Sequence, residues 1–257
     1  MTFNQKFNAF KTIVIKEYMR FIRIWIQTVI PPAITTALYF VIFGELIGSQ
    51  ISDINGYSYM DYIVPGLILM AVITNAYGNV VSSFYSAKFQ KSIEELLVSP
   101  VPNYLIISGY VSGGVARGLV VGFVVTLVAM FFSDFHVHNI FVALAVFVLT
   151  AVLFSLAGFI NAVYAKSFDD ITIIPTFVLT PLTYLGGIFY SIEMLPEFWQ
   201  KVSLLNPILY MINSFRYGLL GITDTDLISA FAIIILFIIG LFCFAIFLLN
   251  RGTGIKQ

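Results

Sequence analysis

The run Ile140–Ala165, IFVALAVFVLTAVLFSLAGFINAVYA, decides the fold class. It contains 26 residues and no Asp, Glu, Lys or Arg. A helix that crosses the hydrocarbon layer of a bilayer needs about 20 mainly apolar residues. This run therefore predicts a transmembrane helix, and the rest of the chain is interpreted outward from it.

The composition of the whole chain agrees with this interpretation. Of 257 residues, 60% are hydrophobic and 10% are charged, and the mean hydropathy is +0.97. Soluble domains carry about a quarter charged residues. Thirteen basic and thirteen acidic residues give zero net charge, which argues against a nucleic-acid binder. The single cysteine excludes an intrachain disulfide.

Five further apolar runs have membrane length. We expect an all-α integral membrane protein in which residues 25–250 form the transmembrane domain, between an N-terminal segment 1–24 and a tail 251–257. The six expected spans are Trp25–Ile47, Tyr62–Tyr85, Tyr104–Phe132, Ile140–Ala165, Ile171–Tyr190 and Leu227–Asn250.

The distribution of Lys and Arg predicts the orientation. Ten of the 13 lie before the first span, in the second and fourth loops or after the last span. Cytoplasmic segments carry the excess of positive charge. Both termini are therefore expected on the cytoplasmic side, as an even number of spans requires.

The N-terminal segment has the pattern of an amphipathic helix that lies in the headgroup region. An ordinary positively charged anchor and a helix with a dedicated role both fit the pattern. The apolar positions are Phe7, Phe10, Val14, Tyr18 and Phe21, and the basic positions on another face are Lys16, Arg20 and Arg23.

The cytoplasmic loop Ser86–Asn103, SAKFQKSIEELLVSPVPN, predicts a second amphipathic helix, which ends before Pro100. An apolar stripe in a loop indicates a partner groove that receives it, and a linker lying on the membrane surface is the alternative. The stripe is Phe89, Ile93, Leu96 and Leu97, and Glu94 and Glu95 lie beside it.

The outward segment Ser191–Thr225 predicts two short helices, Leu195–Leu205 and Asn206–Leu220. Two half-length apolar helices favour a re-entrant pair between spans five and six, provided that protein or water satisfies the polar groups of its turn. An interfacial flap held by aromatic residues is the alternative.

The third span carries Gly114, Gly118 and Gly122 at intervals of four. This spacing lets helices approach closely. Packing within the bundle is the favoured interpretation, and a dimer seam is the alternative.

Arg117 is a charge inside the third span, which usually marks a partner or a water path. Glu45 and Asp61 are candidate counter-charges, and snorkelling to the interface is the alternative. Polar residues in other spans, including Asn75 and Asn79, are expected to form interhelical hydrogen bonds or to line a translocation surface.

Catalytic constellations are not evident in the sequence. His136 and His138 are the only histidines and fall in one short outward loop, which disfavours a buried Ser-His pair or a metal site. The chain has no G-x-x-x-x-G-K-[ST] loop for ATP. Any transport driven by ATP therefore needs another subunit.

Three ordered blocks carry a family resemblance: KFQKSIEELLVSPVP at Lys88–Pro102, the stretch Phe154–Gln200 that begins FSLAGFINAVYAKSFDD, and LNPILYMINSFRYG ending at Gly218. In these blocks the chain resembles the ABC-2 type permeases, especially small ones of the bacterial inner membrane. The resemblance covers nearly the whole chain.

This resemblance implies an exporter subunit that forms a homodimer and binds two ATP-binding cassette subunits, which hold ATP and Mg²⁺. It implies that segment 1–24 is a connecting helix, that Phe89–Val98 is a coupling helix, and that drugs, lipids or glycans are the cargo. An ATP-independent channel or scaffold is the alternative function, and an intramembrane enzyme is a weaker one. Spans one and five would line the path with Tyr39, Phe40, Phe43, Phe177, Tyr184 and Phe189.

Overall fold

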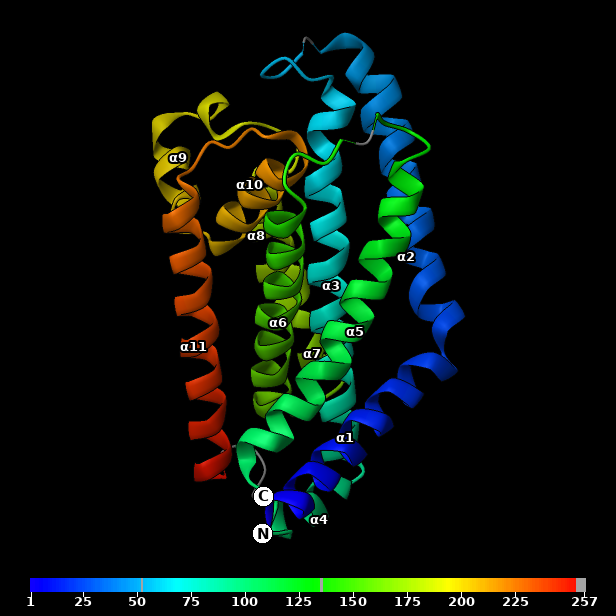
Figure 1. The fold of residues 1–257 in the computed structure, drawn as a ribbon, viewed down its shortest axis with the longest axis vertical. Helices are drawn as coiled ribbons and strands as arrows, with labels where there is room; N and C mark the ends of the chain where they lie inside the picture. The colour runs from blue at the N-terminus through cyan, green and yellow to red at the C-terminus, as the bar shows by residue number, and fades with distance from the viewer. Residues whose placement is uncertain (52, 135, 253–257) are drawn as a thin grey trace.

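The computed structural model describes residues 1–51, 53–134 and 136–252, and these ranges are helical throughout apart from short connections. Five of the described helices are long and apolar enough to cross a membrane, which confirms an all-helical chain with several spans (Figure 1). They are Trp25–Gly44, which comprises α2 (Trp25–Tyr39) and the start of a π-helical turn (Phe40–Ile47), α3 (Tyr59–Phe89), α5 (Asn103–Ala129), α6 (Ile140–Tyr164) and α11 (Leu227–Arg251).

The segment predicted as the fifth span is shorter than expected. It consists of α7 (Asp170–Ile174), a π-helical turn (Pro175–Leu179) and α8 (Thr180–Tyr184), and the chain then turns at Gly187, where φ is +78°. Fifteen helical residues extend about 22 Å, whereas the hydrocarbon layer is about 30 Å thick. By length and composition, five of the described helices qualify as spans, and this segment does not.

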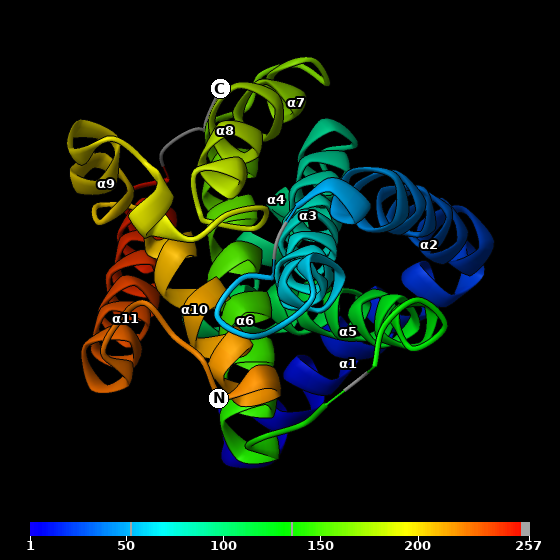
Figure 2. The same cartoon turned by 90° about the horizontal axis from the view of Figure 1, so that it is seen from above.

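α3 lies at the centre of the bundle, beside α2, α5, α6 and α10 (Pro207–Leu220) (Figure 2). In its most apolar stretch, 83% of the residues are buried, compared with 17% in the first span and 22% in α11. α3 is therefore the packing core, while the first span and α11 present most of their surface outward.

The glycines of α5 permit this close packing. A Cβ added to Gly118 would lie 2.9 Å from the Cβ of Ala76 on α3, and one added to Gly122 would meet Val72 and Phe147. Gly114 faces Ser155 and the backbone of Ala76. The stripe packs inside the bundle, as favoured from the sequence, since its partners are α3 and α6.

α1 (Phe3–Arg23) and α4 (Ser92–Val98) lie together at one end of the molecule, where α11 also ends (Figure 1). The N-terminal helix begins with a capping box in which Thr2 and Gln5 satisfy each other's backbone amides. α1 packs across α5, and it is not among the five described helices that are long and apolar enough to cross a membrane.

The opposite end carries α9 (Glu197–Ser203) and α10, which confirm the two short helices predicted there (Figure 1). Protein groups satisfy the turn between them, since Asn206 Nδ2 donates to Leu182 O at 2.6 Å and Tyr210 Oη donates to Leu204 O at 2.8 Å. Arg216 on α10 is buried, donates to Gly187 O at 2.6 Å and stacks 3.9 Å from the ring of Tyr62.

Candidate functional site

The loop Ser86–Asn103 forms a shorter helix than predicted. α3 continues through Phe89, and Lys91 adopts a left-handed conformation (φ +59°) before α4 begins at Ser92. The expectation of one helix over Phe89–Val98 was therefore wrong, because a positive φ interrupts the helix. Phe89 belongs to the end of the second span.

The apolar stripe of α4 packs against its own chain. Ile93 is 2% exposed, and Leu96 and Leu97 pack against the core. The interpretation that the stripe needs a partner's groove is corrected for these three residues, because the bundle itself receives them. The residues that α4 presents outward are Glu94, Glu95 and Val98, of which Val98 is 88% exposed. Sequence reasoning did not select Val98.

Aromatic and cationic contacts hold this surface on the bundle. The ring of Phe89, 65% exposed, lies 5.2 Å from that of Phe168, which also contacts Tyr85 at 4.9 Å. Lys88 Nζ donates to Val163 O at 2.8 Å and to Ala165 O at 2.7 Å. These carbonyls are at the end of α6, so Lys88 ties the end of α3, just before α4, to the end of the fourth span.

A groove of about 410 Å³ lies between α1 and α4. It has both charged and apolar walls and lies beside α4, the helix that carries Val98. Its lining residues are Thr12, Ile13, Lys16, Ser92, Glu95, Leu96, Ser99 and Tyr110.

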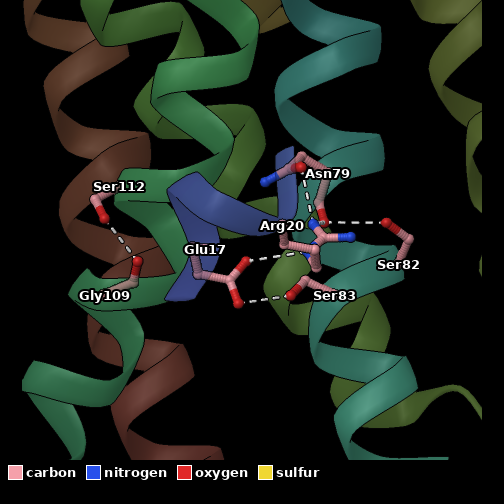
Figure 3. Close-up of polar contacts among 7 residues, drawn as sticks. All are labelled: Glu17, Arg20, Asn79, Ser82, Ser83, Gly109 and Ser112. Carbon is pink, nitrogen blue, oxygen red and sulfur yellow. Dashed lines mark hydrogen bonds and ion pairs between the residues drawn. The ribbon is translucent and has the colours of Figure 1, made fainter. Parts of the chain in front are cut away.

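A buried polar network connects α1 to α3 (Figure 3). Glu17 is fully buried and accepts a hydrogen bond from Ser83 Oγ at 2.8 Å. Arg20 Nη2 donates to Asn79 O at 2.9 Å and to Asn79 Oδ1 at 2.8 Å, and Arg20 Nε lies 3.6 Å from Glu17 Oε2. The sequence interpretation placed Arg20 toward lipid, whereas the structure turns it into the bundle.

Small residues on α5 make room for this network. A Cβ on Gly113 would lie 2.7 Å from the Cβ of Glu17, and one on Gly109 would lie 2.9 Å from the Cβ of Ile13. Burial raises the pKa of the Glu17 carboxyl above its ordinary value, and the positive charge of Arg20 opposes that shift. The sequence offered only a weak indication that Glu17 would be buried. Polar residues four positions apart on α3, Asn79 and Ser83, indicate a polar face that a charged side chain could meet.

Arg117 lies about halfway along α5, and its Nη2 donates to Asn75 Oδ1 at 3.1 Å. Asp61, a predicted counter-charge, instead accepts a hydrogen bond from Ser58 at 2.6 Å at the start of α3. The side chain of Glu45, the other candidate, lies outside the described residues. Arg117 therefore has a neutral amide as its hydrogen-bond partner within the described ranges.

Four of the six residues predicted along the path come together as an aromatic cluster. The ring of Phe189 lies 4.8 Å from Phe43, 6.0 Å from Tyr184 and 6.2 Å from Tyr39. Two residues do not join it. Phe40 is buried against Phe132, away from the cluster, and the side chain of Phe177 is 73% exposed.

His136 and His138 do not assemble a metal site in the described ranges, where no group of three or more His, Cys, Asp or Glu side chains could hold a metal ion. His136 Nδ1 lies 2.6 Å from Asp134 O, and the ring of His138 contacts that of Tyr217 at 5.3 Å.

Comparison with known proteins agrees with this architecture. The family model of the ABC-2 type transporters matches residues 8–220. The chain is 61% identical over 250 residues to the inner membrane transport permease YadH of Escherichia coli (strain K12), with 97% of each chain covered. It is 22% identical over 215 residues to nodulation protein J of Rhizobium leguminosarum bv. viciae, with 83% of each covered. The match over most of its length shows that the chain belongs to the ABC-2 type transporter family.

Proposed function

We propose that this chain is the membrane permease subunit of an ATP-binding cassette exporter in a bacterial inner membrane. It would act as a homodimer with both termini cytoplasmic, and a separate subunit would hold ATP and Mg²⁺. The name of the relative YadH supports the location. The missing phosphate-binding loop supports a separate motor subunit.

The observation that carries this proposal is the polar network between α1 and α3. The network includes Glu17, Arg20, Asn79 and Ser83, and most of its groups are buried. A buried, hydrogen-bonded network resists displacement, because separating its members would leave polar groups unsatisfied. Movement of α1 would therefore be transmitted to the central helix of the bundle.

The outward surface of α4 would be the contact for the ATP-binding subunit. Val98, Glu94, Glu95 and the ring of Phe89 supply an exposed apolar and acidic surface at the end where α1 lies. Closure of the ATP-binding subunits would push this end, and the bundles would tilt between inward-open and outward-open states.

At the opposite end, the α9–α10 pair would form a re-entrant hairpin. The hydrogen bonds of Asn206 and Tyr210 supply the internal satisfaction that such a turn requires in lipid. The aromatic cluster of Tyr39, Phe43, Tyr184 and Phe189 would line the path near this end. Because Asp170–Tyr184 is shorter than the hydrocarbon layer, a sixth crossing would need the connection that follows Tyr184 as well.

The test is affinity purification of the full-length chain from native membranes, with mass spectrometry of the co-purifying subunit and measurement of its ATPase activity. Val98→Asp is expected to reduce both, since Val98 is exposed and the fold does not need it. Phe131→Asp is the matched control, because Phe131 is also exposed but follows the end of α5, at the other end of that helix from α4. Purification without any ATP-binding subunit would refute the transporter assignment and favour a channel or scaffold.

A further inference from the structure

A cavity of about 270 Å³ lies between α2 and α3 and has no role in the coupling described above. One part of its wall is apolar, with Leu67 and Met70, and another part carries the hydroxyl groups of Thr35 and Thr74. Asn75, which is 5% exposed, completes the polar part. The cavity thus has the mixed lining that suits a molecule with an apolar and a polar portion.

Asn75 connects this cavity to a positive charge. Its Oδ1 accepts the hydrogen bond of Arg117 Nη2 at 3.1 Å, while its Nδ2 donates to Ala71 O at 2.9 Å. Within the described residues, Arg117 Nε is buried and has no hydrogen-bond partner. A guanidinium group offers five N–H donors. The single hydrogen bond to a neutral amide oxygen therefore leaves most of the donors of Arg117 free for a ligand.

Among the described side chains, no ion pair joins Arg117 to a carboxylate. Glu17 is engaged by Ser83 at 2.8 Å and by Arg20 at 3.6 Å. Lys16 Nζ lies 5.7 Å from the ring of Tyr110 on α5. The described part of the cluster between α1, α3 and α5 therefore holds more positive side chains, Lys16, Arg20 and Arg117, than negative ones, Glu17.

The depth of Arg117 makes this excess significant. Arg117 is the fifteenth of 27 residues in α5, so its Cα lies about 20 Å from either end of the helix. A charge near the middle of a span is costly unless it is paired, and such residues commonly mark the path of a charged ligand.

The first span leaves the cavity open at an apolar surface of this chain. Only 17% of its apolar window is buried, and Ile34 and Leu38 next to the cavity residues are more than half exposed. A ligand that arrives through this surface must itself be largely apolar. A small hydrated anion would have to shed its water to follow the same route.

We propose that the cavity between α2 and α3 binds an amphiphile with one anionic headgroup, a phosphate or a carboxylate. The headgroup pairs with Arg117 beside Asn75, and the apolar chain lies along Leu67 and Met70. That this amphiphile is the cargo rests on the proposed transport function, whereas its binding does not.

The experiment measures binding of radiolabelled dodecyl phosphate, below its micellar concentration, to the full-length chain in dodecyl maltoside. Arg117→Gln is expected to weaken binding about tenfold or more, because it removes a charge-assisted hydrogen bond. Lys201→Gln removes an exposed positive charge on α9 and serves as the matched control, with unchanged binding expected.

A second variant keeps the test decisive if Arg117→Gln does not fold. Thr35 is exposed where it lines the cavity, so Thr35→Trp fills the space and leaves Arg117 in place. It is expected to weaken dodecyl phosphate binding to a similar extent. Unchanged affinity in either folded variant would overturn the proposed site.

Inorganic phosphate separates an amphiphile site from a site for a free anion. We expect it not to displace dodecyl phosphate at equal concentration, and equal competition would overturn the amphiphile assignment. The binding of dodecyl phosphate can also be measured without the ATP-binding subunit. Loss of the predicted binding while an ATP-binding subunit still co-purifies would refute this site alone, whereas binding by a chain that recruits no such subunit would refute the transport function alone.

Discussion

Gly113→Ala gives a direct test of how α1 is held on the bundle. The added Cβ would lie 2.7 Å from the Cβ of Glu17, whereas ordinary contacts are 3.4–4 Å. Neither atom can rotate away, because each position is fixed by its own backbone. α1 must therefore move by about 1 Å, the difference between the two distances.

The cost follows from this displacement. A 1 Å shift stretches the hydrogen bond from Ser83 Oγ to Glu17, now 2.8 Å, beyond hydrogen-bonding range. Overpacking costs about 1–3 kcal/mol, and loss of a hydrogen bond to a charged group costs about 1.5–3 kcal/mol. After about 1 kcal/mol is subtracted for the better helix propensity of alanine, the expected loss of unfolding free energy is about 3 kcal/mol.

The assay is reversible unfolding of the full-length chain in mixed micelles, followed by the fluorescence of its two tryptophans, Trp199 and Trp25, of which Trp25 is the first residue of α2. Gly240→Ala is the matched control, because a Cβ at exposed Gly240 on α11 would meet nothing within 4 Å. It is expected to leave stability unchanged or slightly raised. Equal stabilities of the Gly113→Ala and Gly240→Ala variants would refute the account of the α1 contact.

Three other predictions concern the ends of the bundle. Ile93→Ala is expected to lower the unfolding free energy by about 2–5 kcal/mol, because Ile93 is buried. Val98→Ala should leave the unfolding free energy unchanged. Equal effects of the two substitutions in chemical unfolding would contradict the orientation of α4. Burial raises the pKa of Glu17 above 4.5, so the folded state holds its proton more tightly and this contribution to stability is lost as pH rises from about 4.5 through the folded-state pKa. Glu17→Gln should remove that part of the pH dependence, and an unaltered stability profile would exclude Glu17 as its source. Hydrogen bonds from Ser229 lower the pKa of the Asp226 carboxyl at the start of α11. The contribution of Asp226 to folding stability is therefore present above pH 3.8 and is lost as pH falls through the folded-state pKa. Asp226→Ala should lower the melting temperature at neutral pH and weaken the fall of the melting temperature at acid pH.

The sequence predicted the helices well where hydropathy or a proline break marked their extent. A run such as Ile140–Ala165 can satisfy its backbone in lipid only as a helix, and α6 covers almost the same residues. The two outward helices were also recognisable, since Asn206-Pro207 marks the break between them. The end of the predicted fifth span could not be recognised in this way. Its prolines and Gly187 end the helix by changing the backbone conformation, which hydropathy does not reveal.

The faces of the amphipathic segments could not be predicted from spacing alone. Ile93 belongs to an apolar stripe in the sequence, but whether that stripe meets a partner or its own bundle depends on where α3 ends and α4 turns. The left-handed Lys91 decides this. Likewise, Phe40 follows Tyr39 in a predicted path, yet successive helical residues point about 100° apart, and Phe40 packs against Phe132 instead.

By itself the sequence determined that this chain is a helical membrane protein that resembles ABC-2 permeases, because hydropathy, charge distribution and ordered motifs are properties of the linear chain. Only the tertiary structure placed Glu17 against Ser83 and Arg117 against Asn75. Each pair joins helices far apart in the sequence, and glycines such as Gly113 let those helices approach closely enough for the polar groups to meet. The positions of the buried charges therefore follow from the packing of the helices and not from the hydropathy of any single segment.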